Sequence, residues 1–216
     1  MNENLTLHWE QVYLNKNDFE MSWHQEEPET SLEMAKKAGL TVTSKVIDVG
    51  GGTSRFVDSL LSEGVIDITV LDLSRSALDM TRQRLGDQGE KVTWVASNIT
   101  DWAPTSQYDL WHDRAVFHFL VDESDRSAYL RNLSTSLRFG GHAIIATFAL
   151  DGPEKCSGLP VVRYSPESLS ETLGSGFGLR AQRQVRHFTP WGSPQSFQFS
   201  FFEKLPNKTT DCATAE

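Results

Sequence analysis

The stretch VIDVGGGTSRF, residues 46–56, decides the fold of this chain: an apolar run of strand length contains an acid and ends in three consecutive glycines. Without Cβ atoms, glycines permit a tight turn and let a ligand approach the backbone. Apolar residues then recur at helical spacing from Phe56 to Leu61, and Gly64 is a typical helix stop. The stretch therefore predicts a strand, a ligand-binding loop and a helix.

The same alternation of strand and helix continues along the chain. Four more apolar runs predict strands at residues 66–71, 92–96, 108–112 and 142–148. Parallel strands joined by helical crossovers form a sheet that is wound on both sides. Two later runs, 179–186 and 197–205, are joined by HFTPWGSPQS, which has no room for a crossover helix and so predicts an antiparallel pair. The predicted fold class is α/β: a doubly wound seven-stranded sheet, mostly parallel with an antiparallel C-terminal hairpin, and helices on both faces.

The length of the chain sets its domain organisation. A chain of 216 residues suits one domain, which is predicted at residues 41–205. Residues 1–40 hold aromatic residues amid polar ones and are predicted to form a helical cover over the active site. Residues 206–216 are predicted to be a disordered tail. A monomer is the default expectation.

Charge and composition exclude several kinds of partner. A net charge of −9 at pH 7 argues against nucleic acid, whose binding requires clustered Lys and Arg. No apolar run has the length of a membrane span, and the N-terminus lacks a basic segment followed by an apolar one. We therefore expect no membrane partner and a cytoplasmic location. Two cysteines cannot form a multi-cysteine metal site, so no metal is expected.

A second acid indicates the kind of ligand. Asp72 ends the second predicted strand, 24 residues after Asp48 (72 − 48 = 24). A carboxylate at that place can accept hydrogen bonds from both ribose hydroxyls of a nucleoside. A dinucleotide is disfavoured, because Arg55 stands where its fingerprint needs a third glycine and Asp48 would repel a pyrophosphate. The pattern favours a nucleoside that carries positive charge, and an ordinary tight turn is the alternative for the glycines alone.

These features resemble the class I S-adenosylmethionine-dependent methyltransferases over roughly residues 42–205. The family motif D-x-G-x-G is matched by Asp48, Gly50 and Gly52. In the family a glycine or another small residue usually follows two positions later, and this chain has Ser54 there. The resemblance implies a Rossmann-like sheet, with S-adenosyl-L-methionine as cofactor and S-adenosyl-L-homocysteine as product. The cofactor-binding residues that it implies are Asp48, Gly50, Gly51, Gly52, Asp72, Leu73, Asn98, Ile99, Asp113 and Trp23.

The chemistry is expected at the end of the fourth predicted strand. Asp113-Arg114-Ala115 resembles the D-[RK]-[GA] element of thiopurine methyltransferases and of several protein-lysine methyltransferases. The resemblance implies that Asp113 lies near the methyl donor, where it is a candidate catalytic residue and base; a helix cap or an ion pair with Arg114 is the alternative. His118 is a candidate general base, and a packed core histidine is the alternative for it.

The expected acceptor site draws on several segments. Trp9 with Trp23-His24-Gln25 resembles the aromatic-His-Gln element that closes over the cofactor in thiopurine-type methyltransferases. An aromatic face such as Trp23 can also stabilise a sulfonium by a cation–π contact. The alternative is an amphipathic helix that packs its tryptophans on the sheet. The predicted substrate-binding residues are Trp23, His24, Arg114, His118, Arg163 and Trp191.

The sequence thus predicts an S-adenosylmethionine-dependent methyltransferase that acts on a small-molecule nucleophile by direct in-line displacement, with a thiol among the candidate acceptors. Two alternatives stay open. The Asp113-Arg114 element and the acidic surface suit a protein-lysine N-methyltransferase, whose acceptor is a protein lysine. A non-catalytic S-adenosylmethionine-binding regulatory domain would keep the same cofactor residues.

Overall fold

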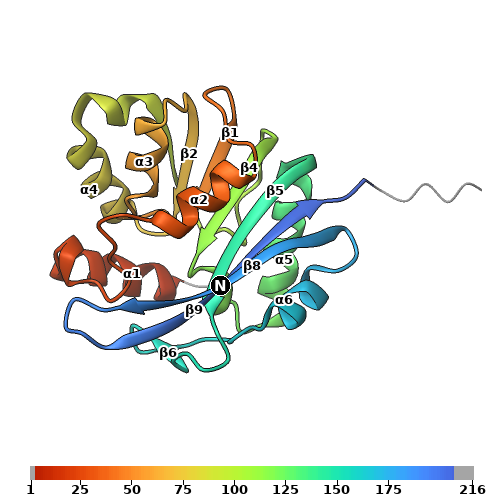
Figure 1. The fold of residues 1–216 in the computed structure, drawn as a ribbon. Helices are drawn as coiled ribbons and strands as arrows, with labels where there is room; N and C mark the ends of the chain where they lie inside the picture. Colours follow the sequence, from red (N-terminus) through yellow and green to blue (C-terminus); the bar gives the residue numbers. More distant parts are fainter. Residues whose placement is uncertain (1–2, 207–216) are drawn as a thin grey trace, which may run out of the picture.

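The computed structural model describes residues 3–206, and its main sheet contains seven strands. In chain order they are β1 (Lys45–Val49), β2 (Asp67–Asp72), β3 (Val92–Ala96), β4 (Tyr108–Arg114), β5 (Leu137–Phe148), β8 (Phe177–Phe188) and β9 (Pro194–Lys204). Their spatial order is β3-β2-β1-β4-β5-β9-β8 (Figure 1). Strand β9 runs antiparallel to β5 and β8, and every other neighbouring pair is parallel. The predicted fold class is therefore confirmed.

Helices cover both faces of this sheet (Figure 1). They are α1 (Glu3–Asn15), α2 (Glu29–Lys37), α3 (Phe56–Ser62), α4 (Arg75–Leu85), α5 (Glu123–Ser136) and α6 (Pro166–Leu173), with short 3-10 turns η1 (Asp18–Glu20), η2 (Gly86–Lys91) and η3 (Phe117–Phe119). One buried apolar cluster joins α2, α3 and α4 to one face, and a second joins α5 and α6 to the other. Neighbouring residues of β1 divide between them, Val46 in the first and Ile47 in the second, because successive strand side chains point to opposite faces.

Local sequence explains why β1 and its loop form. Only Lys45 of β1 is exposed, as expected for a central parallel strand that is buried on both faces. The strand ends at Val49, and the next residue, Gly50, has a φ of +68°, in the left-handed region that glycine adopts readily. Ser74 caps α4 by accepting the N–H of Ala77 at 3.1 Å. These signals fix the carboxyl ends of β1 and β2 and the start of α4.

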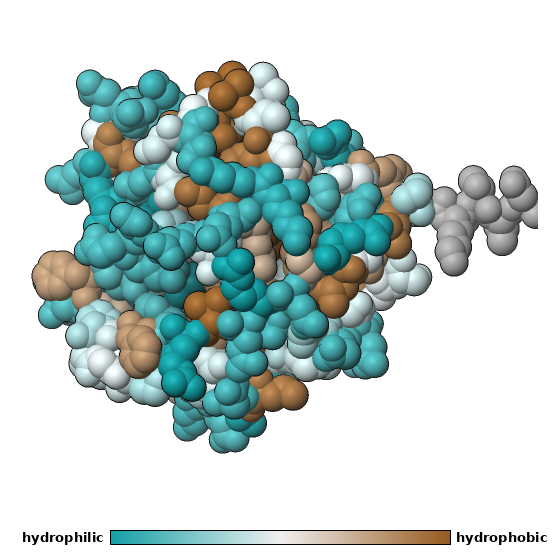
Figure 2. Space-filling view, viewed as in Figure 1, coloured by the Kyte–Doolittle hydropathy of each residue, from teal (hydrophilic) through white to brown (hydrophobic). Residues whose placement is uncertain are grey.

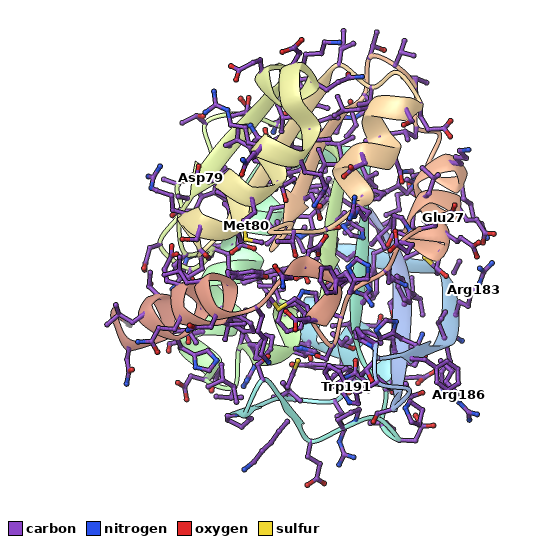
Figure 3. All side chains as sticks on the ribbon, turned by 90° about the vertical axis from the view of Figure 1, so that its left-hand side faces the viewer. Glu27, Asp79, Met80, Arg183, Arg186 and Trp191 are labelled. Carbon is purple, nitrogen blue, oxygen red and sulfur yellow. The ribbon has the colours of Figure 1, made fainter. Side chains whose placement is uncertain are left out.

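Helix α1 is anchored to the start of α4. The carboxylate of Glu10 accepts the backbone N–H of Arg75 at 2.6 Å and that of Ser76 at 3.4 Å. These N–H groups belong to the first turn of α4, where no carbonyl within the helix can accept them. Figure 3 shows α1 below α4, which carries Asp79 and Met80. The N-terminal helix is thereby held beside the carboxyl ends of the strands, while the division into a cover and a catalytic domain stays a prediction.

Some details differ from the sequence expectations. Strand β5 begins at Leu137, before the predicted residue 142, because Leu137 also pairs with Tyr108 across an irregular register. A small hairpin of β6 (Lys155–Cys156) and β7 (Leu159–Pro160) was not predicted, since two-residue strands show no periodicity. Of the predicted tail, residues 207–216 lie outside the described residues.

Figure 2 shows a mainly hydrophilic face, on which hydrophobic residues form small separate groups. Within residues 3–206, every helix is too short or too polar to cross a bilayer.

Candidate active site

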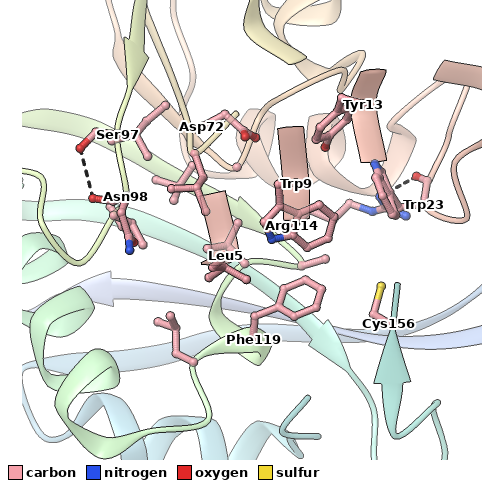
Figure 4. Close-up of a pocket in the computed structure, with 18 residues that line it drawn as sticks. Leu5, Trp9, Tyr13, Trp23, Asp72, Ser97, Asn98, Arg114, Phe119 and Cys156 are labelled. Atoms are coloured by element: carbon pink, nitrogen blue, oxygen red, sulfur yellow. Dashed lines mark hydrogen bonds between the residues drawn. The ribbon is translucent and has the colours of Figure 1, made fainter. Parts of the chain in front are cut away.

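A crevice lies at the carboxyl ends of β1, β2 and β4, next to the point where the strand order reverses (Figure 4). Helix α1 covers it with Leu5, Trp9 and Tyr13. These side chains share one helix face, because each is four residues from the next. In open α/β sheets this edge is where ligands bind.

The glycine loop after β1 leaves no room for side chains. At Gly50 a Cβ atom would lie 2.0 Å from Cγ2 of Val116. At Gly51 it would lie 2.6 Å from Cγ1 of Val70 and 2.7 Å from Oδ2 of Asp48. Atoms do not approach so closely without displacement, so both positions require glycine. Of the three loop glycines, Gly50 lines the crevice, whereas Gly51 and Gly52 do not.

Asp72 ends β2 beside this loop, and it lines the crevice. Its Oδ1 accepts the N–H of Ser74 at 2.8 Å, which fixes the side chain. Burial raises the pKa of Asp72 to about 7, although the backbone N–H groups of Ser74 and Gly52 act in the opposite direction. A buried carboxylate gains from further donors, because hydrogen bonds favour its charged form.

Three more of the predicted cofactor-binding residues gather next to Asp72. Leu73, Asn98 and Ile99 line the same crevice. The Oδ1 of Asn98 accepts the N–H of Thr100 at 3.1 Å, so its amide is held in the turn after β3. The structure therefore brings these residues together from two neighbouring strand ends.

A second pocket continues from the crevice, and Tyr13, Trp23, Gly50 and Arg114 line both. Asp48 lies in the second pocket, where its Oδ2 is buried and has no hydrogen-bond partner within residues 3–206. A buried polar atom without a partner costs free energy. The second pocket thus offers one free anionic acceptor.

Arg114 supplies positive charge between the two pockets. Its Nη1 donates to the carbonyl of Trp23 at 2.9 Å, and its guanidinium lies 4.7 Å from the ring centroid of Phe197. Its Nε and Nη2 are buried and have no acceptor in the described part of the chain. Burial lowers the pKa of Arg114 to about 10, so it remains cationic at neutral pH. Together with Asp48, it makes the second pocket complementary to a zwitterionic α-amino acid group.

Asp113 is fully buried and lines neither of these two pockets. Its Oδ1 accepts the N–H of Val116 at 2.8 Å, and its Oδ2 accepts from the hydroxyl of Tyr129 at 2.6 Å and the N–H of Phe117 at 3.1 Å. Burial raises its pKa to about 6. These bonds hold the turn in which Ala115 has a φ of +76°. The geometry matches the helix-cap alternative, and cofactor contact and catalysis by Asp113 stay predictions.

His118 is also fully buried and lines neither pocket. Its Nδ1 accepts the N–H of Phe148 at 3.2 Å. Burial, together with the positive charge of Arg114, lowers the pKa of His118 to about 3. A group whose pKa lies so far below neutrality is a weak general base. The geometry matches the packed-histidine alternative, and the catalytic and acceptor-binding roles of His118 stay predictions that it does not favour.

The other predicted acceptor-binding residues divide into two groups. Trp23 and Arg114 line the crevice, and His24 lines the second pocket. Arg163 instead forms an ion pair with a glutamate of its own loop. Trp191 is 60% exposed at the β8–β9 turn, in the lower half of Figure 3, and it lines neither pocket.

Several crevice residues had no assigned role in the sequence analysis: Leu5, Tyr13, Phe119 and Cys156. The ring of Trp9 meets those of Trp23 and Phe119 edge-on, at centroid distances of 5.7 and 5.2 Å. Figure 4 shows these rings near Arg114. The four-residue spacing of Leu5, Trp9 and Tyr13 was the available signal, whereas Phe119 and Cys156 reach the crevice only through the fold.

The strand order, the glycine loop after β1 and the acid at the end of β2 agree with the arrangement that the resemblance to class I S-adenosylmethionine-dependent methyltransferases implied. A model of the methyltransferase-domain family matches residues 46–141, slightly less than half of the chain, and together with the fold this match supports the class that the resemblance implied. Membership of the thiopurine-type or protein-lysine subgroup stays a prediction.

Known proteins with similar sequence or structure include several methyltransferases. Ubiquinone biosynthesis O-methyltransferase of Vibrio vulnificus (strain YJ016) is 28% identical over 143 residues, and the match covers 61% of this chain and 59% of that relative. N-methyltransferase NodS of Bradyrhizobium japonicum WM9, crystallised with S-adenosyl-L-homocysteine, superposes with a TM-score of 0.69 at 16% identity, covering 92% of this chain and 98% of its own. A structure concerning conversion of a disulfide bond into a thioacetal group during echinomycin biosynthesis gives 0.71 at 21% identity, covering 94% of both chains. At these identities the structural matches show the fold.

Proposed function

We propose that this chain transfers the methyl group of S-adenosyl-L-methionine to a small-molecule nucleophile. The observation that carries the proposal is the pair of joined pockets with different chemistry. The first holds the carboxylate of Asp72 among apolar side chains, and the second holds the free acceptor of Asp48 and the free donors of Arg114. Adenosine followed by an α-amino acid group fits this order.

When bound, S-adenosyl-L-methionine supplies an electrophilic sulfonium methyl group. In the proposed mechanism Asp72 accepts from the ribose hydroxyls, Asp48 accepts from the ammonium group and Arg114 donates to the carboxylate. The rings of Trp9 and Trp23 exclude water and favour positive charge nearby. Holding an acceptor in line can lower the barrier by about 7–11 kcal/mol, whereas a general base adds about 10²–10⁴-fold. Positioning is therefore the main task of these residues.

The buried state of the two candidate bases bears on the acceptor. Asp113 and His118 lie outside both pockets, so neither reaches a group bound there in this arrangement. This favours an acceptor that ionises without a protein base, and a thiol with a pKa of about 8.5 does so in part at neutral pH. The relative named for ubiquinone biosynthesis supports a small-molecule acceptor without deciding its atom.

The test combines binding with transfer. Isothermal titration should detect S-adenosyl-L-homocysteine but not NADH, and the methyl-labelled cofactor with cell extract should label the small-molecule fraction. Label in protein bands would instead support the protein-lysine alternative, and binding without transfer the regulatory one. Heat from NADH together with none from S-adenosyl-L-homocysteine at millimolar concentration would overturn the proposal. We also propose a cytoplasmic monomer without a nucleic-acid partner, which fractionation and sedimentation can test.

A further inference from the structure

The carboxylate of Asp48 belongs to a chain of three buried side chains. His112 places its Nδ1 2.6 Å from Oδ1 of Asp48 and its Nε2 2.8 Å from Oγ of Ser31. Each of the three residues is 1% exposed. They come from β1, β4 and α2, so these hydrogen bonds connect two strands of the sheet to the N-terminal segment.

The fold fixes each member of this chain. Asp48 and His112 are register partners on neighbouring parallel strands, so their side chains share one face of the sheet. The ring of Phe56 lies on that of His112, with centroids 4.1 Å apart. Helix α2 packs on the same face through Met34 and Ala35, which brings the Ser31 hydroxyl to the imidazole.

The same order of groups, serine to Nε2 and aspartate to Nδ1, occurs in hydrolases that use serine as a nucleophile. Here that use is excluded by access, because Ser31 is fully buried and lines neither pocket. The three hydrogen-bonded side chains reach a pocket at the opposite end, through Asp48. Asp48 and His112 both line the second pocket, and the atom without a partner is Oδ2 of Asp48.

We infer that Ser31 and His112 are positioning residues, which hold Asp48 so that its Oδ2 receives the α-ammonium group of the cofactor. This inference rests on the proposed function. A carboxylate with one oxygen fixed by a short hydrogen bond keeps one orientation, and its other oxygen needs no rearrangement when a cation arrives. Helix α2 carries Ser31, so its packing on the sheet contributes to ligand binding through His112 and Asp48. The helix does not have to contact the ligand itself.

The test compares two probes by calorimetry: S-adenosyl-L-homocysteine, and 5′-deoxy-5′-methylthioadenosine, which lacks the amino acid group. His112→Phe keeps a ring against Phe56 and removes both nitrogens, so affinity for the first probe should fall at least tenfold and for the second less than twofold. His112→Asn keeps a donor near the Nδ1 position and should recover most of the loss. Ser31→Ala should lower the affinity for the first probe about threefold.

A matched control is His142→Phe, because His142 lies on β5 with its ring stacked on Phe201, outside both pockets. It should leave both affinities unchanged. Equal losses for both probes in His112→Phe, or no loss in any His112 or Ser31 variant, would overturn the inference. If His112→Phe does not fold, as judged by circular dichroism, Ser31→Ala and His112→Asn provide the same comparison. A wild-type protein that binds neither probe would instead contradict the proposed function.

Discussion

Asp72→Asn should make the ligand-free protein more stable and should weaken its binding of the cofactor. Burial raises the pKa of Asp72 from 3.8 to about 7. The neutral carboxyl therefore contributes stability that is fully present below pH 3.8 and is lost as the pH rises through 7. At 1.36 kcal/mol for each pH unit, the loss amounts to about 4 kcal/mol above pH 7. Asparagine cannot ionise, so the variant does not undergo this loss of stability.

Part of this gain is offset in the variant. The amide oxygen can still accept from Ser74, but the amide NH₂ cannot accept from Gly52, which costs about 1–3 kcal/mol. We expect the free energy of unfolding at pH 8 to rise by about 1–3 kcal/mol. The gain should be about 3 kcal/mol smaller at pH 5, where the wild-type carboxyl is mostly protonated.

Urea denaturation at pH 5 and pH 8 measures these differences. Asp67→Asn is the matched control, because Asp67 begins the same strand and is half-exposed in an ion pair with Lys45. In this control variant, the change in the free energy of unfolding should not depend comparably on pH. Calorimetry should find S-adenosyl-L-homocysteine bound at least tenfold more weakly by Asp72→Asn. An equal effect on stability at both pH values would refute the burial argument, and an unchanged affinity would refute the ribose assignment.

Three further outcomes are expected. The affinity of the wild-type protein for S-adenosyl-L-homocysteine should rise about tenfold between pH 6 and pH 8, since the ionised fraction of Asp72 rises about tenfold; a flat calorimetric profile would contradict this. Tyr129→Phe removes the hydroxyl that donates to Asp113 and accepts from Nε1 of Trp111, so the free energy of unfolding in urea should fall by about 1–3 kcal/mol, and no change would show that the bonds contribute nothing. Gly51→Ala places a Cβ 2.6 Å from a side-chain carbon of β2 and should lower the free energy of unfolding by about 1–3 kcal/mol in the same assay; unchanged stability would contradict the steric argument.

The seven-stranded sheet could be predicted because its signals are local. Apolar runs, helical spacing and Gly64 mark where each element begins or ends, and the short link between the last two strands requires antiparallel pairing. A predicted boundary was wrong where pairing extended a strand beyond its apolar run, as at Leu137. The hairpin of β6 and β7 had no local signal at all.

The cofactor side of the site was predictable for a similar reason. Gly50 and Asp72 sit at strand ends, and parallel strand ends meet at one edge of the sheet. The roles expected for Asp113 and His118 depended instead on which groups surround them. Three donors surround the carboxylate of Asp113, and burial near Arg114 makes His118 a weak base.

The sequence by itself determined the order of strands and helices, the bare glycine backbone and the acid at the end of β2, because periodicity and backbone preference act over a few residues. Only the tertiary structure decided that Asp48 meets His112 across 64 residues and that His112 meets Ser31 across 81. Such pairings depend on strand register and helix docking. The physical reason is that a side chain's partners, and hence its charge state and free atoms, are set by packing between segments that no local pattern relates.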